Sequence, residues 1–192
     1  SVYGVGANGH VQGNTYVTIK ETDSNKRTTI GLEGVGGWHG NVYAGGGGTD
    51  RYTEDNAKKL SITAGRVFGN TNVNIEGGSI KHNVYGGGAL ASVGTYLKNN
   101  AQGDFQAYLG GGIARVNITG GTIGTNGDNN GMVFGSGRGE IMAPDQIMDT
   151  LTYMAYTFVN IGKNNNGTYE GDAKIKGSVY GSGENGHAYL ES

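Results

Sequence analysis

The sequence contains no cysteine, a single proline and few charged residues, and it has no long hydrophobic run. Without cysteine the chain has no disulfide scaffold, no thiolate metal site and no cysteine nucleophile. With 40 glycines but one proline in 192 residues, and without glycine at every third position, the chain is not collagen. No apolar stretch reaches the ~18 residues that a membrane-spanning helix requires.

Charge is scarce and balanced, since 14 lysines and arginines face 16 aspartates and glutamates. This balance leaves no basic surface of the kind that binds nucleic acid or anionic lipid. The length favours a single domain over residues 1–192. Glycine-rich polar chains are often disordered, but here β-branched and aromatic residues recur in short clusters. This recurrence indicates a folded chain in which glycine serves the turns.

Two short sequence words recur along the chain. The first, called the V-[YF]-G word, joins valine, an aromatic residue and a glycine-rich tail. Its six copies are Val2-Tyr3-Gly4, Val42-Tyr43-Ala44-Gly45, Val67-Phe68-Gly69, Val84-Tyr85-Gly86, Val133-Phe134-Gly135 and Val179-Tyr180-Gly181. The second, called the V-x-I word, alternates apolar and polar residues and is typical of a half-buried strand. Its copies are Val17-Thr18-Ile19, Leu60-Ser61-Ile62, Val73-Asn74-Ile75, Val116-Asn117-Ile118 and Val159-Asn160-Ile161.

Together the words predict an all-β chain of short strands and glycine turns, seen most clearly from Val73 to Gly88, VNIEGGSIKHNVYGGG. One such unit cannot bury its apolar face, whereas stacked units pair each strand with its copy one coil away. We therefore predict a parallel β-solenoid with coils ~4.8 Å apart. The residues expected to be buried are Val73, Ile75, Val116, Ile118, Val159 and Ile161.

The words resemble the Gly-rich parallel β-helix repeats of large bacterial surface or secreted proteins, especially those of gut bacteria. The resemblance rests on VYGGG after V-x-I-x-GG-x-I in the unit from Val73 to Gly88. Ala7-Asn8-Gly9-His10 and Glu184-Asn185-Gly186-His187, each just after a V-[YF]-G word, add to it. The resemblance implies a right-handed parallel β-helix that is extracellular or at the cell surface, and it implies no reaction.

Both ends of the chain lie inside the repeat pattern, because it opens on Ser1-Val2-Tyr3-Gly4 and closes on Ser178-Val179-Tyr180-Gly181. An open coil exposes unpaired backbone groups, and natural solenoids cover their ends with atypical coils. We expect a segment of a longer protein, or end-to-end self-association between copies.

Two stretches interrupt the repeats. The polar stretch Thr49 to Lys59 is predicted to form a lateral loop. The Met-rich insert 138–156 holds the only proline, Pro144. Its apolar residues follow helical spacing, so we predict one short helix near 144–155, packed by its methionine face on the solenoid wall. A partner-binding or lid role is the alternative for this insert.

The aromatic residue of the V-[YF]-G word is predicted to stack into a ladder between coils. A ladder can be purely structural, or outward tyrosines can stack on sugar rings. The candidate carbohydrate-binding residues are Tyr3, Tyr43, Tyr85 and Tyr180. Phenylalanine in two of the six copies shows that the hydroxyl is dispensable there, which favours a structural ladder.

Other polar residues indicate structure rather than chemistry. Asn74, Asn117 and Asn160 recur at the outward position of the V-x-I word and predict an asparagine ladder. The stretch 125–131 lacks the spacing of a calcium loop, which favours a turn. His10 and His187 occupy one repeat position and are predicted to lie in turns. No cofactor, metal site or catalytic set is predicted, and Asp50, Glu54 and Asp55 are expected to be solvated loop charges.

These features predict a non-catalytic structural or adhesive β-helix module of a bacterial surface or secreted protein. Its expected partner is a glycan or a host surface protein, with no nucleic acid. The alternative is a carbohydrate-binding or polysaccharide-degrading β-helix, a lyase or hydrolase. An enzyme of this kind requires a groove with convergent carboxylates and perturbed pKa values, whereas a stalk has flat walls and repeated ladders.

Overall fold

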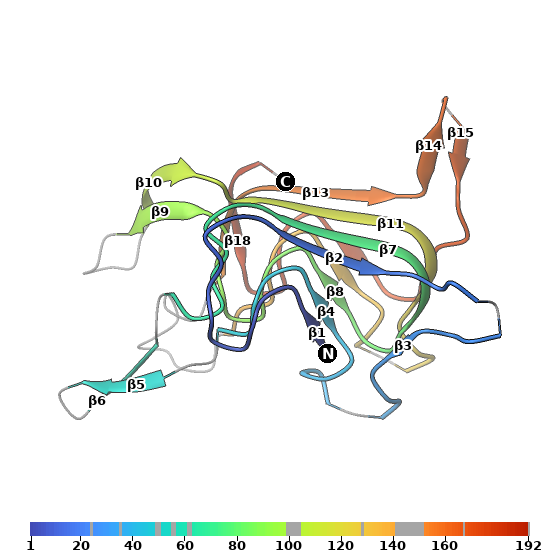
Figure 1. Cartoon of the computed structure of the whole chain (residues 1–192), viewed down its shortest axis with the longest axis horizontal. Helices are drawn as coiled ribbons and strands as arrows, with labels where there is room; N and C mark the ends of the chain where they lie inside the picture. Colours follow the sequence, from blue (N-terminus) through green and yellow to red (C-terminus); the bar gives the residue numbers. More distant parts are fainter. Residues whose placement is uncertain are drawn as a thin grey trace.

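Two parallel β-sheets stack on each other to form the body of the protein (Figure 1). The computed structural model describes residues 1–23, 25–34, 36–48, 51–54, 57–60, 63–98, 105–127, 129–140, 152–166 and 168–191. Every regular element in these ranges is a strand. No helix in the described ranges has the length and apolar character needed to cross a membrane. The expectation of an all-β, parallel and solenoid-like chain is confirmed.

The V-[YF]-G words form the first sheet, here called the short-strand sheet. In spatial order its strands are β1 (Val2–Tyr3), β4 (Val42–Tyr43), β8 (Val84–Tyr85), β12 (Val133–Phe134) and β17 (Val179–Tyr180). All neighbours are parallel, and valine pairs with valine in every step, as in Val42 with Val84. Each coil of the chain therefore adds one copy of the word to the stack.

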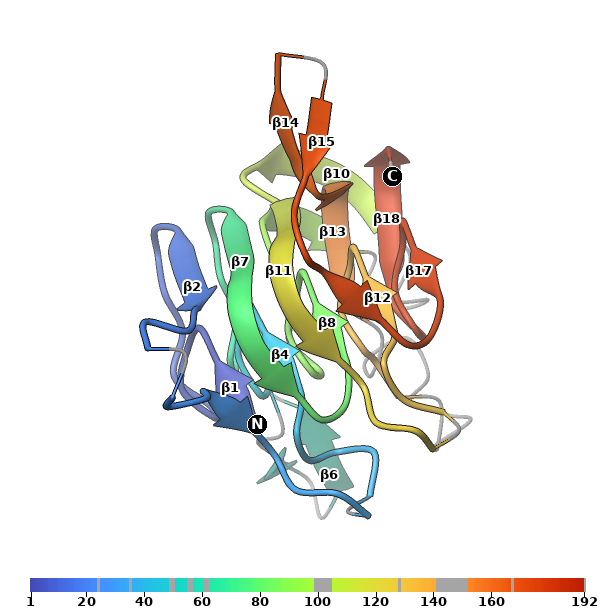
Figure 2. The same cartoon turned by 90° about the vertical axis from the view of Figure 1, so that its right-hand side faces the viewer.

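The V-x-I words form the second sheet, here called the long-strand sheet, whose strands lie side by side in Figure 2. Its strands are β2 (Thr15–Ile19), β7 (Thr71–Ile80), β11 (Ile113–Ile123), β13 (Tyr153–Ile161) and β18 (His187–Glu191). Two short strands extend it, β3 (Thr29–Ile30) beside β7 and β16 (Lys174–Ile175) beside β11. Pairing is again parallel and in register, with Val73 opposite Val116 and Val116 opposite Val159.

The core lies between the two sheets, because the valines of one word and the apolar residues of the other point toward each other. Its buried members are Val17, Ile19, Val42, Ala44, Val73, Ile75, Ile80, Val84, Val116, Ile118, Ile123 and Val133. Complete burial of a valine or isoleucine side chain stabilises the fold by about 1.5–3 kcal/mol. No single coil encloses this core, which explains why the words must repeat.

Burial of the V-x-I words is confirmed in β7 and β11 but fails in β13. Val73, Ile75, Val116 and Ile118 are almost completely buried, whereas Val159 is half-buried and Ile161 is 39% exposed. Strand β18 pairs with β13 only between Tyr153 and Tyr156. The second half of β13 therefore has a paired neighbour on one side only, which leaves Ile161 accessible.

Two predicted members of the words lie elsewhere. Val67-Phe68 is not a strand of the short-strand sheet, since Val67 instead bridges Val11 and Val93 on a third side of the coil. Leu60 ends strand β6 (Ala57–Leu60), which pairs antiparallel with β5 (Arg51–Glu54). The stretch 49–59 thus contains a hairpin rather than a plain loop, while Asp50 and Asp55 lie outside the described residues.

The predicted helix near 144–155 is wrong where the structure describes it. Tyr153, Met154 and Ala155 belong to strand β13, and residues 141–151 lie outside the described residues. Tyr153 and Met154 pair with strand β18 in parallel. These backbone hydrogen bonds between strands determine the local structure, although the spacing of the apolar residues is that of a helix. Met154 is buried beside Val67, Val93 and Ala114.

In the described part of the chain, three antiparallel hairpins extend from the coils, and Figure 1 shows them beyond the two sheets. They are β5–β6, β9 (Thr95–Lys98) with β10 (Phe105–Gly110), and β14 (Lys163–Asn165) with β15 (Thr168–Glu170). The parallel frame thus carries local insertions without losing its register.

Buried threonines connect the sheets from one coil to the next. Thr15, Thr71 and Thr157 occupy one column of the long-strand sheet. Each donates a hydrogen bond to the carbonyl that follows the V-[YF] pair of the next coil, with distances of 2.7, 2.6 and 2.5 Å. The acceptor of Thr71 is Gly86, where a Cβ would overlap the carbonyl oxygen of Gly135. Glycine is required at this position because the coils approach so closely.

Replacement of Thr71 by valine is expected to lower the free energy of unfolding by about 1–3 kcal/mol. The change keeps the shape of the side chain but removes the donor to the buried carbonyl of Gly86. Urea denaturation measures the loss. The matched control is Thr18→Val on the exposed face of β2, which should change stability by less than about 0.5 kcal/mol. Equal effects of the two variants would contradict the proposed role of Thr71.

Candidate functional site

The aromatic side chains of the short-strand sheet stack into a continuous ladder. Successive ring centroids from Tyr3 through Tyr43, Tyr85 and Phe134 to Tyr180 are 4.7–5.0 Å apart, with interplanar angles of 7–11°. These distances match the spacing of neighbouring strands, as predicted. Phe68, the sixth aromatic residue, is outside the ladder and faces His10 edge-on at 5.7 Å.

The four candidate carbohydrate-binding tyrosines differ in accessibility. Tyr43 and Tyr85 are completely buried, so neither ring offers a face to a sugar in this structure. Tyr3 and Tyr180, at the two ends of the ladder, are 37% and 45% exposed. Because side chains alternate along a strand, the aromatic rings point away from the valine core, as the sequence predicts. The sequence pattern does not predict that other residues cover the middle of the ladder.

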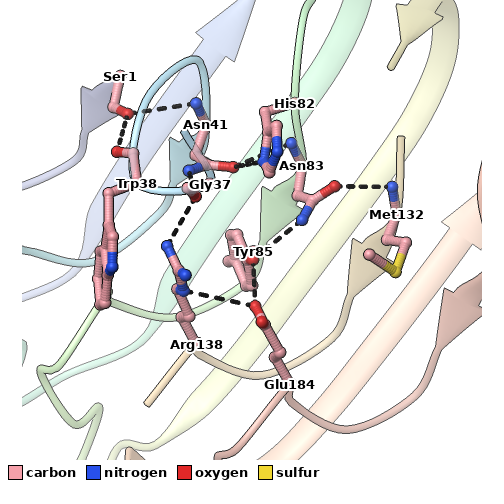
Figure 3. A network of polar contacts seen from close by, with 10 residues as sticks. All are labelled: Ser1, Gly37, Trp38, Asn41, His82, Asn83, Tyr85, Met132, Arg138 and Glu184. Carbon is pink, nitrogen blue, oxygen red and sulfur yellow. Dashed lines mark hydrogen bonds and ion pairs between the residues drawn. The ribbon is translucent and has the colours of Figure 1, made fainter. Parts of the chain in front are cut away.

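An ion pair between Arg138 and Glu184 lies beside the buried Tyr85 (Figure 3), and Arg138 also lies close to Tyr43. Arg138 Nε is 3.5 Å from Glu184 Oε2, and the hydroxyl of Tyr85 donates to the same oxygen at 2.6 Å. Asn83 Nδ2 donates in turn to the Tyr85 hydroxyl at 3.1 Å. Burial is the main cause that raises the pKa of Tyr85 above its ordinary value, and the charge of Glu184 adds to it. The phenol therefore remains a hydrogen-bond donor at neutral pH.

Arg138 also reaches a loop that is distant in the sequence. Its Nη1 donates to the carbonyl of Gly37 at 2.7 Å, and its guanidinium lies 3.5 Å from the ring centroid of Trp38. A guanidinium over an indole face is a favourable cation–π contact. Arg138 thus holds the loop that contains Gly37 and Trp38 against the coil that contains Glu184.

A second set of hydrogen bonds runs beside the tyrosines through the residue before each V-[YF] pair. Ser1 Oγ accepts from the Asn41 N–H, Asn41 Oδ1 accepts from the Asn83 N–H, and Asn83 Oδ1 accepts from the Met132 N–H. The distances are 3.2, 3.0 and 2.9 Å. Each side chain thus satisfies a backbone donor of the next coil, and the series ends at Met132, whose side chain has no oxygen to continue it.

His82 joins this set and has a defined tautomer. Its Nδ1 is 3.0 Å from Asn41 Oδ1, an oxygen that also accepts the Asn83 N–H. Nδ1 must therefore carry the proton, which leaves a lone pair on Nε2 of the neutral ring. Burial, and then the charge of Arg138, lower the pKa of His82 below its ordinary value of 6.5. The ring is neutral at physiological pH.

These residues line a polar hollow of about 470 Å³. Its walls are formed by Gly37, His82, Asn83, Tyr85, Asn129, Met132, Arg138 and Glu184. The volume falls within the roughly 300–1,000 Å³ that small-molecule sites occupy. We take this hollow and the Arg138–Glu184 pair beside it as the candidate functional site.

A second polar hollow, of about 410 Å³, lies where β7 and β11 bend. Glu21, Asp23, Glu76 and Asp172 line it together with Arg27, whose Nε is 3.9 Å from Glu21 Oε1. Among the described residues, no group of three histidine, aspartate or glutamate side chains is placed to hold a metal ion.

The structure contains the expected asparagine ladder and the expected turn at 125–131, but it places His187 in a strand. The asparagine ladder is confirmed, since Asn117 Nδ2 donates to Asn74 Oδ1 and Asn160 Nδ2 to Asn117 Oδ1, both at 2.9 Å. The stretch 125–131 contains a turn held by Asn130, whose Oδ1 accepts the Thr125 N–H. His187 is in strand β18 and stacks on Tyr153 at 5.5 Å, so its assignment to a turn is wrong.

Sequence reasoning missed Arg138 and Glu184 as a pair. Both lie four residues after the aromatic residue of a V-[YF]-G word. The same position holds Ala7, Gly47 and Ala89 in the other coils of the stack. Opposite charges at a position that is otherwise small, in two successive coils, are the signal in the sequence that identifies the pair.

Comparison of the chain with protein-family models, with curated protein sequences and with solved structures found no match.

The two buried tyrosines give a matched pair of variants. Tyr85→Phe leaves Glu184 and Asn83 without the phenol hydroxyl that both bind, and is expected to lower the free energy of unfolding by about 1–3 kcal/mol. Tyr43→Phe removes a buried hydroxyl that lies near Arg138 but makes no hydrogen bond of good geometry among the described residues, and should cost less stability than Tyr85→Phe. Chemical denaturation of both variants measures the difference. A larger loss for Tyr43→Phe would contradict the assigned hydrogen bonds.

The lowered pKa of His82 predicts a dependence of stability on pH. The unfolded chain binds this proton more readily than the folded chain, so the free energy of unfolding falls as the pH drops below about 6.5. His82→Asn keeps a donor near the position of Nδ1 and removes the titration. Denaturation at about pH 7.5 and about pH 5.5 should show a larger loss for the parent chain than for the variant. Equal losses would exclude His82 as a source of this dependence.

Proposed function

We propose that the chain is a non-catalytic structural module of a bacterial surface or secreted protein, built as a right-handed parallel β-helix. Its function is to hold other parts of that protein, or a bound partner, at a fixed distance. The observation that carries the proposal is the in-register stack of identical words across five strands of the short-strand sheet.

The ladders support a stiff rather than a deformable stack. Aromatic rings, asparagine amides and threonine hydroxyls each connect one coil to the next at several points around the coil. Bending the stack would have to change many of these contacts together, and packed interiors resist such changes. Stiffness along the stack is the property that a spacer needs.

The candidate site is also consistent with a structural role. The hydroxyl of Tyr85 and the charge of Arg138 are both bound to Glu184, and Arg138 is bound to Gly37 as well. Such bonds hold several coils together. Binding to a glycan or a host surface protein would then use the hairpins and loops that the rigid frame positions, because binding residues in proteins are frequently on such loops.

Distance measurement between two spin labels tests the rigidity. Tyr16 and Phe158 are exposed and occupy the same column of the long-strand sheet, three strands apart through Asn72 and Arg115. The chain lacks cysteine, so Tyr16→Cys and Phe158→Cys give two unique labels. We expect one narrow distribution of distances, corresponding to a backbone separation of about 14 Å.

A broad or multiple distribution of distances between the two labels would contradict the rigid-spacer proposal. Singly labelled samples serve as the reference. The same protein, incubated with pectins, glycosaminoglycans and host glycans in the presence of Ca²⁺, is expected to release no product. Reproducible cleavage that Glu184→Gln abolishes would overturn the non-catalytic part of the proposal and favour the polysaccharide-degrading alternative.

A further inference from the structure

We propose that the hollow beside the Arg138–Glu184 pair binds a neutral sugar ring. This assignment goes beyond the spacer function, since it gives the module a specific ligand at a site away from the exposed ends of the tyrosine ladder. It rests on the polar atoms that the internal hydrogen bonds leave unused, on the cancellation of charge and on the space that Gly37 leaves open.

The unused atoms in the walls include both donors and acceptors. His82 Nε2 offers a lone pair, because Nδ1 carries the ring proton. Among the described residues, Glu184 binds its partners through Oε2, which leaves Oε1 as an acceptor. The amide of Asn129 lines the hollow and provides one donor group and one acceptor. Sugar hydroxyls both donate and accept hydrogen bonds, so a sugar ring matches a wall that mixes the two.

The charges of the site favour an uncharged ligand. Glu184 offsets the charge of Arg138 within the ion pair, and His82 is neutral. The carboxylate of an acidic sugar would meet the negative charge of Glu184 beside Arg138, so repulsion from Glu184 would offset its attraction to Arg138. A neutral sugar leaves these internal bonds intact.

Gly37 leaves open the space between the imidazole and the guanidinium. A Cβ at this residue would lie 3.5 Å from His82 Cε1 and 3.6 Å from Arg138 Nη2, which are ordinary contact distances. Trp38, the next residue and the chain's single tryptophan, is 36% exposed and has Arg138 over its ring. Trp38 is not part of the wall of the hollow, but its ring contacts Arg138, which is, so the indole senses changes at the wall.

Titration with methyl glycosides of glucose, galactose, mannose and N-acetylglucosamine tests the assignment, with galacturonic acid as the acidic comparison. Fluorescence of Trp38 and the NMR signal of its indole N–H report binding, because the chain has no second tryptophan. We expect saturable binding of at least one neutral glycoside with a dissociation constant of about millimolar, as befits one sugar ring. Tighter binding of galacturonic acid would overturn the neutral assignment.

Matched variants locate the ligand. Gly37→Ala places a methyl group in the hollow without removing a hydrogen bond, and should weaken binding about tenfold or more. Gly36→Ala is its control, because a Cβ there meets nothing within 4 Å. Asn129→Gly removes the wall amide at a positive φ that glycine tolerates, and Asn166→Gly repeats the change at a second positive-φ asparagine outside the hollow.

We expect weaker binding for Gly37→Ala and Asn129→Gly, and unchanged binding for Gly36→Ala and Asn166→Gly. Absence of saturable binding to every glycoside, or equal effects of a variant and its control, would overturn the site. The spin-label distances between residues 16 and 158 are independent of this result, so failure of the sugar site and failure of the rigid spacer are distinguished.

Discussion

Parallel pairing of identical residues between successive coils is the constraint on which the rest of the structure depends. Valine lies on valine in both sheets, aromatic ring on aromatic ring, and asparagine on asparagine. The register is therefore fixed by several independent columns, and a shift by one residue would turn every core side chain toward solvent. The same close stacking requires glycine at Gly86 and Gly135, because a Cβ at either residue would overlap a carbonyl oxygen of the next coil.

The candidate site arises from departures within this regular pattern. A column that holds alanine or glycine in three coils holds Arg138 and Glu184 in the other two. Their long side chains lie over the aromatic ladder and reach Tyr85 and Gly37. Arg138 and Glu184, which depart from the small residues of this column, thus both cover the buried tyrosines and form part of the polar wall of the hollow. The repeated residues build the two sheets, and the residues that differ between coils build the candidate site.

The repeated words were sufficient to predict the parallel sheets, the buried faces of β7 and β11 and the ladders of aromatic and asparagine side chains. Each of these follows from alternation along a strand and from copying between coils. Predictions failed where the position of a residue depends on which strands lie beside it in the folded chain. Met154 has helical spacing but pairs as a strand, Val67 has the right word but bridges a third side, and Ile161 lacks a paired strand on one side. The burial of Tyr43 could not be predicted, because its cover comes from Arg138, which is distant in sequence.

The contacts of Arg138 and Glu184 alter the range over which coils depend on one another. In most stacked repeats each unit contacts only its neighbours, so units can separate from an end one at a time. Glu184 follows β17 and binds Tyr85 of β8, past the intervening β12. Arg138 follows β12 and binds Gly37 ahead of β4, past β8. Departure of one coil therefore breaks bonds to coils that are not its neighbours in the sheet. These bonds couple the stack beyond nearest neighbours and enlarge the unit that must open together.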